Sequence, residues 1–195
     1  MNKESFLLGV SLTCLCVMIL GPKVLDVTPI IIQGGYDTVK VEIEAVRPDF
    51  KLESYQINSS LNKSKLKHLL IYTYALCKEY DVDYELVKAV IQTESSWNHK
   101  AISKSDARGL MQLKPQTALS EFKTHVGDLY DPYINITLGV MYLSKLTHHY
   151  DMDTMGKLLT AYSHGPTATL KYPHSYVNQN FYVSAVLDKL NQKTG

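Results

Sequence analysis

Apolar residues recur at every third or fourth position through most of the chain after residue 62, which is the spacing of amphipathic helices. Two aspartates, Asp83 and Asp131, precede such segments and are predicted N-caps, and Gly165-Pro166 is predicted to end a helix. Residues 125–130 are predicted to form a loop. No sheet pattern competes within this region, so the predicted fold class is mainly α. The predicted helices cover residues 63–80, 84 to about 98, 115–122, 132–150, 153–164, and about 178 to 190.

The first 22 residues show a different pattern. Phe6 to Leu20 is an uncharged run of fifteen residues, which suits the apolar region of a signal peptide better than a membrane span of about 20 residues. Glu4 offsets Lys3, and no Ala-x-Ala cleavage site follows. Residues 1–22 are therefore interpreted as a signal peptide or a retained membrane anchor, and a buried helix of a soluble fold is the remaining alternative.

Residues 23–60 are predicted to form a linker or a short extended arm. Thr38 to Glu44 alternates polar and apolar side chains with a period of two, which is typical of a strand. Gly34-Gly35 and Arg47-Pro48 interrupt the segment. A linker, a small hairpin and a contact for a partner all stay open, and residues 61–195 are predicted to form the helical domain.

Composition narrows the class of protein. A chain of 195 residues with 45% hydrophobic and 20% charged residues fits one globular domain with appendages. A net charge of +1 gives no electrostatic basis for binding nucleic acid. Two of the three cysteines lie in the leader, so Cys77 has no partner for an intrachain disulfide in the domain and is predicted to be a core residue. No Cys or His spacing predicts a metal site.

Glu94 is the most unusual carboxylate in the sequence. It lies three residues after Ile91, four after Val90 and seven after Val87, so it projects from an apolar helix face. Burial there favours the protonated acid, which can then donate a proton to a leaving group. The alternative is a glutamate at the rim of that face, capped by a lysine or a backbone amide.

Four motifs follow one another around this glutamate. The first is Glu-Ser-x-Trp-Asn from Glu94, followed by Ala-x-Ser, which ends at Ser103. The second is Gly-Leu-Met-Gln-Leu from Gly109, followed by Pro-x-Thr-Ala. The third is Ala-Tyr-Ser-His-Gly-Pro from Ala161, and the fourth is Tyr-Val-x-x-Val-Leu from Tyr182. Together they resemble the catalytic core of the bacterial soluble lytic transglycosylases, which share a fold with goose-type lysozyme. The resemblance spans about residues 63–190 and implies a lysozyme-like helical domain.

The resemblance also implies a reaction. Glu94 would protonate the glycosidic oxygen between N-acetylmuramic acid and N-acetylglucosamine in peptidoglycan, and the muramoyl C6 hydroxyl would close a 1,6-anhydro ring without water. One carboxylate suits this chemistry, whereas most glycosidases need two. Asp106 is the other nearby carboxylate, and we expect it to be an exposed turn residue.

The same resemblance assigns the substrate-binding residues. Ser103 and Gln112 would bond the sugars or their acetamido groups, Met111 would line the cleft, and Tyr162 and Tyr182 would flank the glutamate. Tyr162 also lies on an apolar helix face and could simply be a core residue. Ser163 and His164 stand where the family usually has Asn and Ala, and Ser163 is included among the expected substrate contacts.

Two alternatives to a lytic transglycosylase stay open: a hydrolytic muramidase on the same fold, and a non-catalytic peptidoglycan-binding envelope protein. We expect a monomer in the cell envelope or periplasm that acts on peptidoglycan glycan strands without a cofactor. Contact with the membrane would come only through an uncleaved leader. An envelope-spanning apparatus is a further candidate partner.

Overall fold

Short polar side chains set the starts of several helices. Asp83 accepts hydrogen bonds from the backbone N–H groups of Glu85 and Leu86 and so begins the helix that carries Glu94. Asp131 caps the next long helix in the same way, followed by a proline at the first helical position. Both caps are confirmed as predicted from the sequence.

The computed structural model describes residues 61–150 and 152–192. The predicted leader and extended arm lie outside this range. The described part is mainly helical, and its only β-type pairings are isolated bridges that join Arg108 to Ile102 and to Leu113. The helices are α1 Lys63–Glu79, α2 Tyr84–Ser95, α3 Pro115–Phe122, η2 Val126–Tyr130 (a 3₁₀ helix), α4 Pro132–His149, α5 Met155–His164, α6 Pro166–Thr169, α7 His174–Gln179 and α8 Phe181–Asn191.

Four predictions of local structure need correction. The helix predicted from residue 84 to about 98 ends at Ser95, because Ser96 has a left-handed backbone conformation. Residues 126–130, predicted as a loop, form the 3₁₀ helix η2. The residue that caps α5 is Thr154, whose side chain accepts from the Lys157 N–H, while Asp153 instead forms an ion pair with the Lys157 side chain at 2.7 Å. The last helix begins at Phe181 rather than near residue 178, because Asn180 caps it.

Helices α6 and α7 were not predicted at all. They span only four and six residues, which is too short for a helical repeat of apolar positions to be visible in the sequence. Both begin beside a proline, at Pro166 and Pro173, whose fixed backbone angle suits the first turn of a helix. In α7, the buried residue is Val177.

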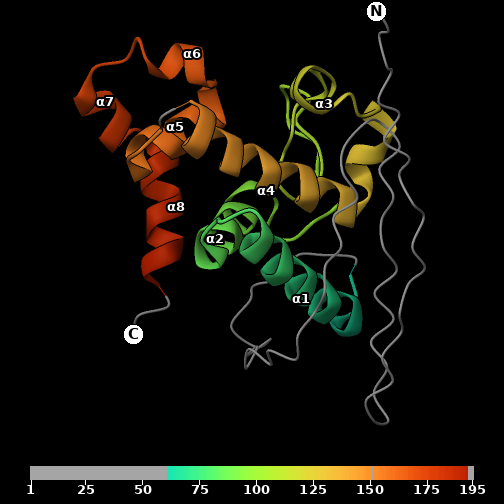
Figure 1. Cartoon of the computed structure of the whole chain (residues 1–195). Coiled ribbons are helices and arrows are strands. Elements are labelled where there is room, and N and C mark those ends of the chain that lie inside the picture. Colours follow the sequence, from blue (N-terminus) through green and yellow to red (C-terminus); the bar gives the residue numbers. More distant parts are fainter. Residues whose placement is uncertain (1–60, 151, 193–195) are drawn as a thin grey trace, which may run out of the picture.

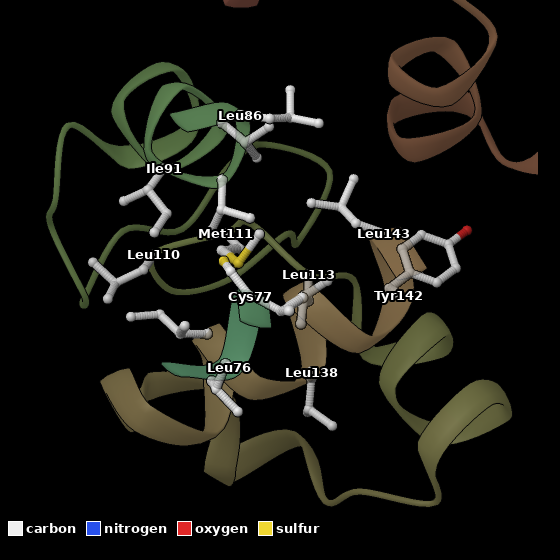
Figure 2. Close-up of a cluster of buried hydrophobic side chains, with 14 of the residues drawn as sticks. Leu76, Cys77, Leu86, Ile91, Leu110, Met111, Leu113, Leu138, Tyr142 and Leu143 are labelled. Atoms are coloured by element: carbon white, nitrogen blue, oxygen red, sulfur yellow. The ribbon is translucent and has the colours of Figure 1, made fainter. Parts of the chain in front are cut away.

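Helix α4 forms the centre of the domain, and residues on most of its sides are buried. It packs against α1, α3, α5 and η2 (Figure 1). Figure 2 shows side chains from α1, α2, α4 and the segment after Gly109 meeting in one cluster. Fully buried members of this core include Leu76, Ile91, Leu110, Met111, Leu138 and Leu143.

Cys77 is buried in the same core, as expected. Burial raises the pKa of its thiol to about 12, so the group stays protonated and unreactive near neutral pH. None of the helices in the described part of the chain is both long and apolar enough to span a membrane.

Gly139 allows a close contact between α4 and Met111 in the core. A Cβ atom at this position of α4 would meet the Sδ, Cε and Cβ atoms of Met111, whose side chain is fully buried. The Met111 side chain can therefore lie directly on the α4 backbone only because residue 139 has no side chain.

We predict that Gly139→Ala destabilises the protein. Displacing a buried side chain by one methyl group costs about 1–3 kcal/mol, which exceeds the gain in helix propensity of up to about 1 kcal/mol. Gly127→Ala is the matched control, because a Cβ there meets no atom within 4 Å. Urea unfolding of both variants measures the difference, and a Gly139→Ala variant as stable as Gly127→Ala would contradict the packing argument.

Candidate active site

Glu94 lies in the last turn of α2 and is half-buried. Val87, Val90 and Ile91, on the same face, are all fully buried. The face packs on α8, and the two helices form the most extensive helix pair of the domain (Figure 1). From α8, the Tyr182 hydroxyl donates a hydrogen bond of 2.6 Å to Glu94 Oε1.

Burial raises the pKa of Glu94 from 4.5 to about 7, and the hydrogen bond from Tyr182 opposes the rise without cancelling it. Within residues 61–150 and 152–192, none of the ion pairs involves Glu94. The carboxyl group is therefore populated in both protonation states near neutral pH, which is what a group that donates and then retakes a proton requires.

A second tyrosine, Tyr162, lies near Glu94 and Tyr182. The Tyr162 hydroxyl, from α5, donates a hydrogen bond of 2.8 Å to the backbone carbonyl of Met111. Burial, and then the nearby charge of Glu94, raise the pKa values of both Tyr162 and Tyr182 well above their usual range. Both therefore remain neutral phenols, and the ring of Tyr162 packs at 5.7 Å from that of Tyr142.

The segment between α2 and α3 has an irregular backbone. Ser96, Trp97, Asp106 and Gln112 have positive φ angles of 49°, 66°, 63° and 48°, which are unusual for residues with a side chain. Gly109 has a φ of 77°, and a Cβ there would meet Asn135 and the Leu129 carbonyl. A segment of this kind needs hydrogen-bond partners other than a helix or a sheet.

Two of the predicted sugar-binding residues supply some of these partners. Ser103 Oγ accepts a hydrogen bond from the Ala107 N–H at 3.0 Å. Gln112 Nε2 donates to the carbonyls of Ala101 and Gly109, at 3.2 and 3.0 Å. Both side chains thus hold the segment in shape.

Asn135 on α4 also holds the segment, and sequence reasoning missed it. Its Oδ1 accepts from the Met111 N–H at 2.7 Å, and its Nδ2 donates to the carbonyls of Arg108 and Leu129, each at 2.9 Å. The side chain is fully buried. The available signal was a polar residue between Ile134 and Ile136 in a largely apolar helix.

Ser95 ties the same segment to α2. Its Oγ donates to the carbonyl of Leu110 at 2.8 Å and also lies 3.2 Å from the carbonyl of Ile91 in its own helix. Because Ser95 follows Glu94 directly, this bond fixes the end of the helix on which the carboxyl group sits.

The structure brings some of the predicted site residues together and leaves others apart. Glu94 is hydrogen-bonded to Tyr182, and the Tyr162 hydroxyl is hydrogen-bonded to the backbone carbonyl of Met111. The Met111 side chain is fully buried in the core (Figure 2). Ser163 Oγ bonds within its own helix and lies 2.7 Å from His164 Nδ1.

Asp106 occupies an exposed turn, as expected. Its carboxylate forms an ion pair with Arg108 at 2.9 Å and makes two hydrogen bonds to the same guanidinium. In the described ranges, no group of three or more His, Cys, Asp or Glu side chains is arranged to hold a metal ion.

Comparison with known proteins places this arrangement among relatives. The chain is 33% identical over 138 residues to the membrane-bound lytic murein transglycosylase E of Buchnera aphidicola. The aligned region covers 64% of this chain and 62% of that protein. The chain thus spans about three fifths of the length of this curated relative.

Two solved structures share the fold. The lytic transglycosylase Slt of Pseudomonas aeruginosa, solved as an inactive mutant, matches with a TM-score of 0.53 at 24% identity, over 63% of this chain and 24% of that one. The 70 kDa soluble lytic transglycosylase of Escherichia coli matches with a TM-score of 0.50 at 25% identity, over 64% of this chain and 25% of that one.

The family model described as the transglycosylase SLT domain matches residues 72–183, which is more than half of the chain and includes Glu94, Tyr162 and Tyr182. The helical fold agrees with the solved relatives. The chain therefore belongs to the transglycosylase SLT domain family.

Proposed function

We propose that this chain is a peptidoglycan lytic transglycosylase in which Glu94 is the only general acid and base. The observation that carries the proposal is the half-buried Glu94 carboxyl group, whose pKa is raised to about 7 by burial and which accepts one hydrogen bond from Tyr182. The membership in the SLT domain family and the name of the Buchnera relative support peptidoglycan as the substrate.

The proposed reaction needs one carboxyl group. Protonated Glu94 gives its proton to the glycosidic oxygen as the bond from C1 of N-acetylmuramic acid to that oxygen breaks. The C6 hydroxyl oxygen of the same sugar forms a new bond to C1, and its proton passes to the Glu94 carboxylate. The enzyme returns to its starting state, the ring is a 1,6-anhydro sugar, and no water is consumed.

The tyrosines act in this scheme through their hydroxyl groups. Tyr182 holds the Glu94 carboxyl in one orientation through the 2.6 Å hydrogen bond and moderates the effect of burial on its pKa. Tyr162, held by the Met111 carbonyl, presents a neutral phenol beside the reacting carboxyl. A neutral hydroxyl can stabilise an oxocarbenium-like centre through its oxygen lone pairs without adding charge.

Ser103, Gln112 and Ser163 are the proposed sugar contacts. Gln112 Nε2 already binds two backbone carbonyls, so its Oε1 is the atom assigned to an acetamido N–H of the substrate. Ser103 accepts from the Ala107 N–H and lies 3.1 Å from Ser105 Oγ, so its remaining hydrogen-bonding capacity faces the substrate in this proposal.

The proposed site of action is the cell envelope. The apolar run Phe6–Leu20 and the membrane-bound relative support export or anchoring through residues 1–22. All the residues in the proposed chemistry come from one chain between residues 94 and 182, which supports action as a monomer, either in general wall turnover or beside an envelope-spanning apparatus.

We predict that Glu94→Gln folds, binds glycan and loses activity by a factor on the order of 10²–10⁴, because the amide keeps the shape of the acid but cannot donate and retake a proton. The measurement is mass spectrometry of fragments released from purified peptidoglycan. Wild-type fragments should carry anhydromuramoyl ends, one water lighter than hydrolytic ends.

Asp106→Asn is the matched control, since its carboxylate is exposed and bound to Arg108, and it should keep most of the activity. An active Glu94→Gln with an inactive Asp106→Asn would reverse the assignment of the acid. Wild-type fragments with hydrolytic ends only would make the protein a muramidase.

We predict that kcat/KM of the wild type falls about tenfold per pH unit above pH 7, because only protonated Glu94 donates. In Tyr182→Phe the hydrogen bond that lowers the Glu94 pKa is lost, so this alkaline limb should shift to higher pH while the maximal rate drops. A pH–rate profile measures both effects. A limb that moves to lower pH in Tyr182→Phe would contradict the role given to this bond.

We further predict that Glu94→Gln is more stable than the wild type at alkaline pH. The native state binds the Glu94 proton more tightly than the unfolded chain, so the unfolding free energy of the wild type falls between pH 4.5 and about 7. The penalty is at most about 3 kcal/mol. Thermal unfolding should give a difference between the variants at pH 8 that vanishes near pH 4; a difference that grows toward low pH would show that burial does not raise this pKa.

A further inference from the structure

Apolar and aromatic side chains are exposed together at the end of the domain that carries α6 and α7. Leu170 is 73% exposed and Phe181 is 89% exposed, and Tyr172 and Tyr176 are each more than a third exposed. His164, at the end of α5, is exposed as well. We call these five residues the aromatic patch. A single exposed apolar residue is ordinary, whereas a group of them marks a binding surface.

Three of these rings pack on one another and hold a fixed geometry. The ring centroids of Tyr172 and Tyr176 lie 4.4 Å apart with an interplanar angle of 44°, and the His164 ring packs edge-on to both, at 5.8 and 6.0 Å. The two nitrogens of His164 are bracketed by hydroxyl groups, from Ser163 at 2.7 Å and from Tyr176 at 3.3 Å. The rings are thus ordered before any ligand arrives.

The chain and its hydrogen bonds connect the aromatic patch to the candidate active site on two sides. On one side, His164 follows Tyr162 by two residues on α5. On the other, the Asn180 N–H donates to the Tyr176 carbonyl at 3.0 Å, and Asn180 then caps α8, whose second residue is Tyr182. Asn180 Nδ2 also donates to Thr160 Oγ1 on α5 at 2.7 Å. The aromatic patch is therefore rigidly continuous with the two tyrosines nearest Glu94.

The charge of this region suits a ligand with acidic groups. From Thr154 to Leu187 the sequence contains no Asp or Glu, while Lys171, His164 and His174 are all exposed. A glycan strand whose sugars bear lactyl and peptide carboxylates would meet no repulsion here. The hydroxyl groups at the edge of the tyrosine rings match sugar hydroxyls better than they match an apolar protein surface.

We propose that the aromatic patch is an additional binding subsite for the glycan strand of peptidoglycan, outside the site at Glu94 where the bond is cleaved. This rests on the proposed function, because the ligand is the rest of the same polymer. The C–H faces of pyranose rings pack on the Tyr172 and Tyr176 rings, and their hydroxyls stay in water or bond to the rim. The subsite favours long strands over short fragments.

The test measures binding in the full chain carrying Glu94→Gln, so that no strand is cut. Tyr172→Ser and Tyr176→Ser should each weaken co-sedimentation with purified sacculi about threefold to tenfold. Tyr176→Phe keeps the ring and should bind like its parent. Leu119→Ser on α3 removes an equally apolar side chain that is 53% exposed outside the patch, and should also bind like its parent.

The decisive comparison uses soluble glycan strands of increasing length. The parent should bind long strands more tightly than single disaccharide units, and Tyr172→Ser and Tyr176→Ser should reduce that preference while keeping the parent's thermal midpoint. Unchanged binding by both serine variants would overturn the subsite and leave a protein partner as the occupant of the patch. A wild type that binds through the patch but never cleaves would instead refute the proposed function and leave the subsite intact.

Discussion

One buried amide, that of Asn135, holds the irregular segment beside Glu94 together with the side chains of Ser95, Ser103 and Gln112. Asn135 binds the backbone N–H of Met111 and the backbone carbonyls of Arg108 and Leu129, and the Arg108 carbonyl also accepts from the Leu113 N–H at 3.1 Å. With its N–H bound on one side, Met111 presents its carbonyl to Tyr162 on the other. Asn135 reaches the segment because Gly109 has no side chain in its way.

The second constraint is electrostatic. Glu94 lies on a face whose other members are apolar, and the hydrogen bond from Tyr182 compensates for only part of the lost hydration. A lysine at that point would lower the pKa and remove the proton that the proposed chemistry needs. The carboxyl group therefore costs stability at neutral pH, and the tight packing of α2 on α8 offsets that cost.

The sequence predicts a helix well when the helix is long enough for its repeat of apolar residues to be visible. The two longest helices, α1 and α4, were predicted to within one residue at each end, and Pro115–Phe122 was matched in full. The short helices α6 and α7 carry too few turns for a repeat to be seen. Glu94 was visible because a charge interrupts an apolar strip. The orientation of Met111 and the bonds of Asn135 arise from contacts between distant segments, and no local pattern encodes them.

The division between the site and its surroundings follows from the same contacts. Tyr162 and Tyr182, which match the family motifs, turn toward the core and Glu94. Their neighbours Ser163 and His164, which stand where the family usually has Asn and Ala, bond to each other, and His164 also bonds to Tyr176 on α7. A substitution at His164 changes an exposed side chain whose hydrogen bonds go to Ser163 and Tyr176 and not to Tyr182 or Glu94. In our proposal, strand recognition can therefore diverge within the family while the acid that cleaves the strand stays fixed.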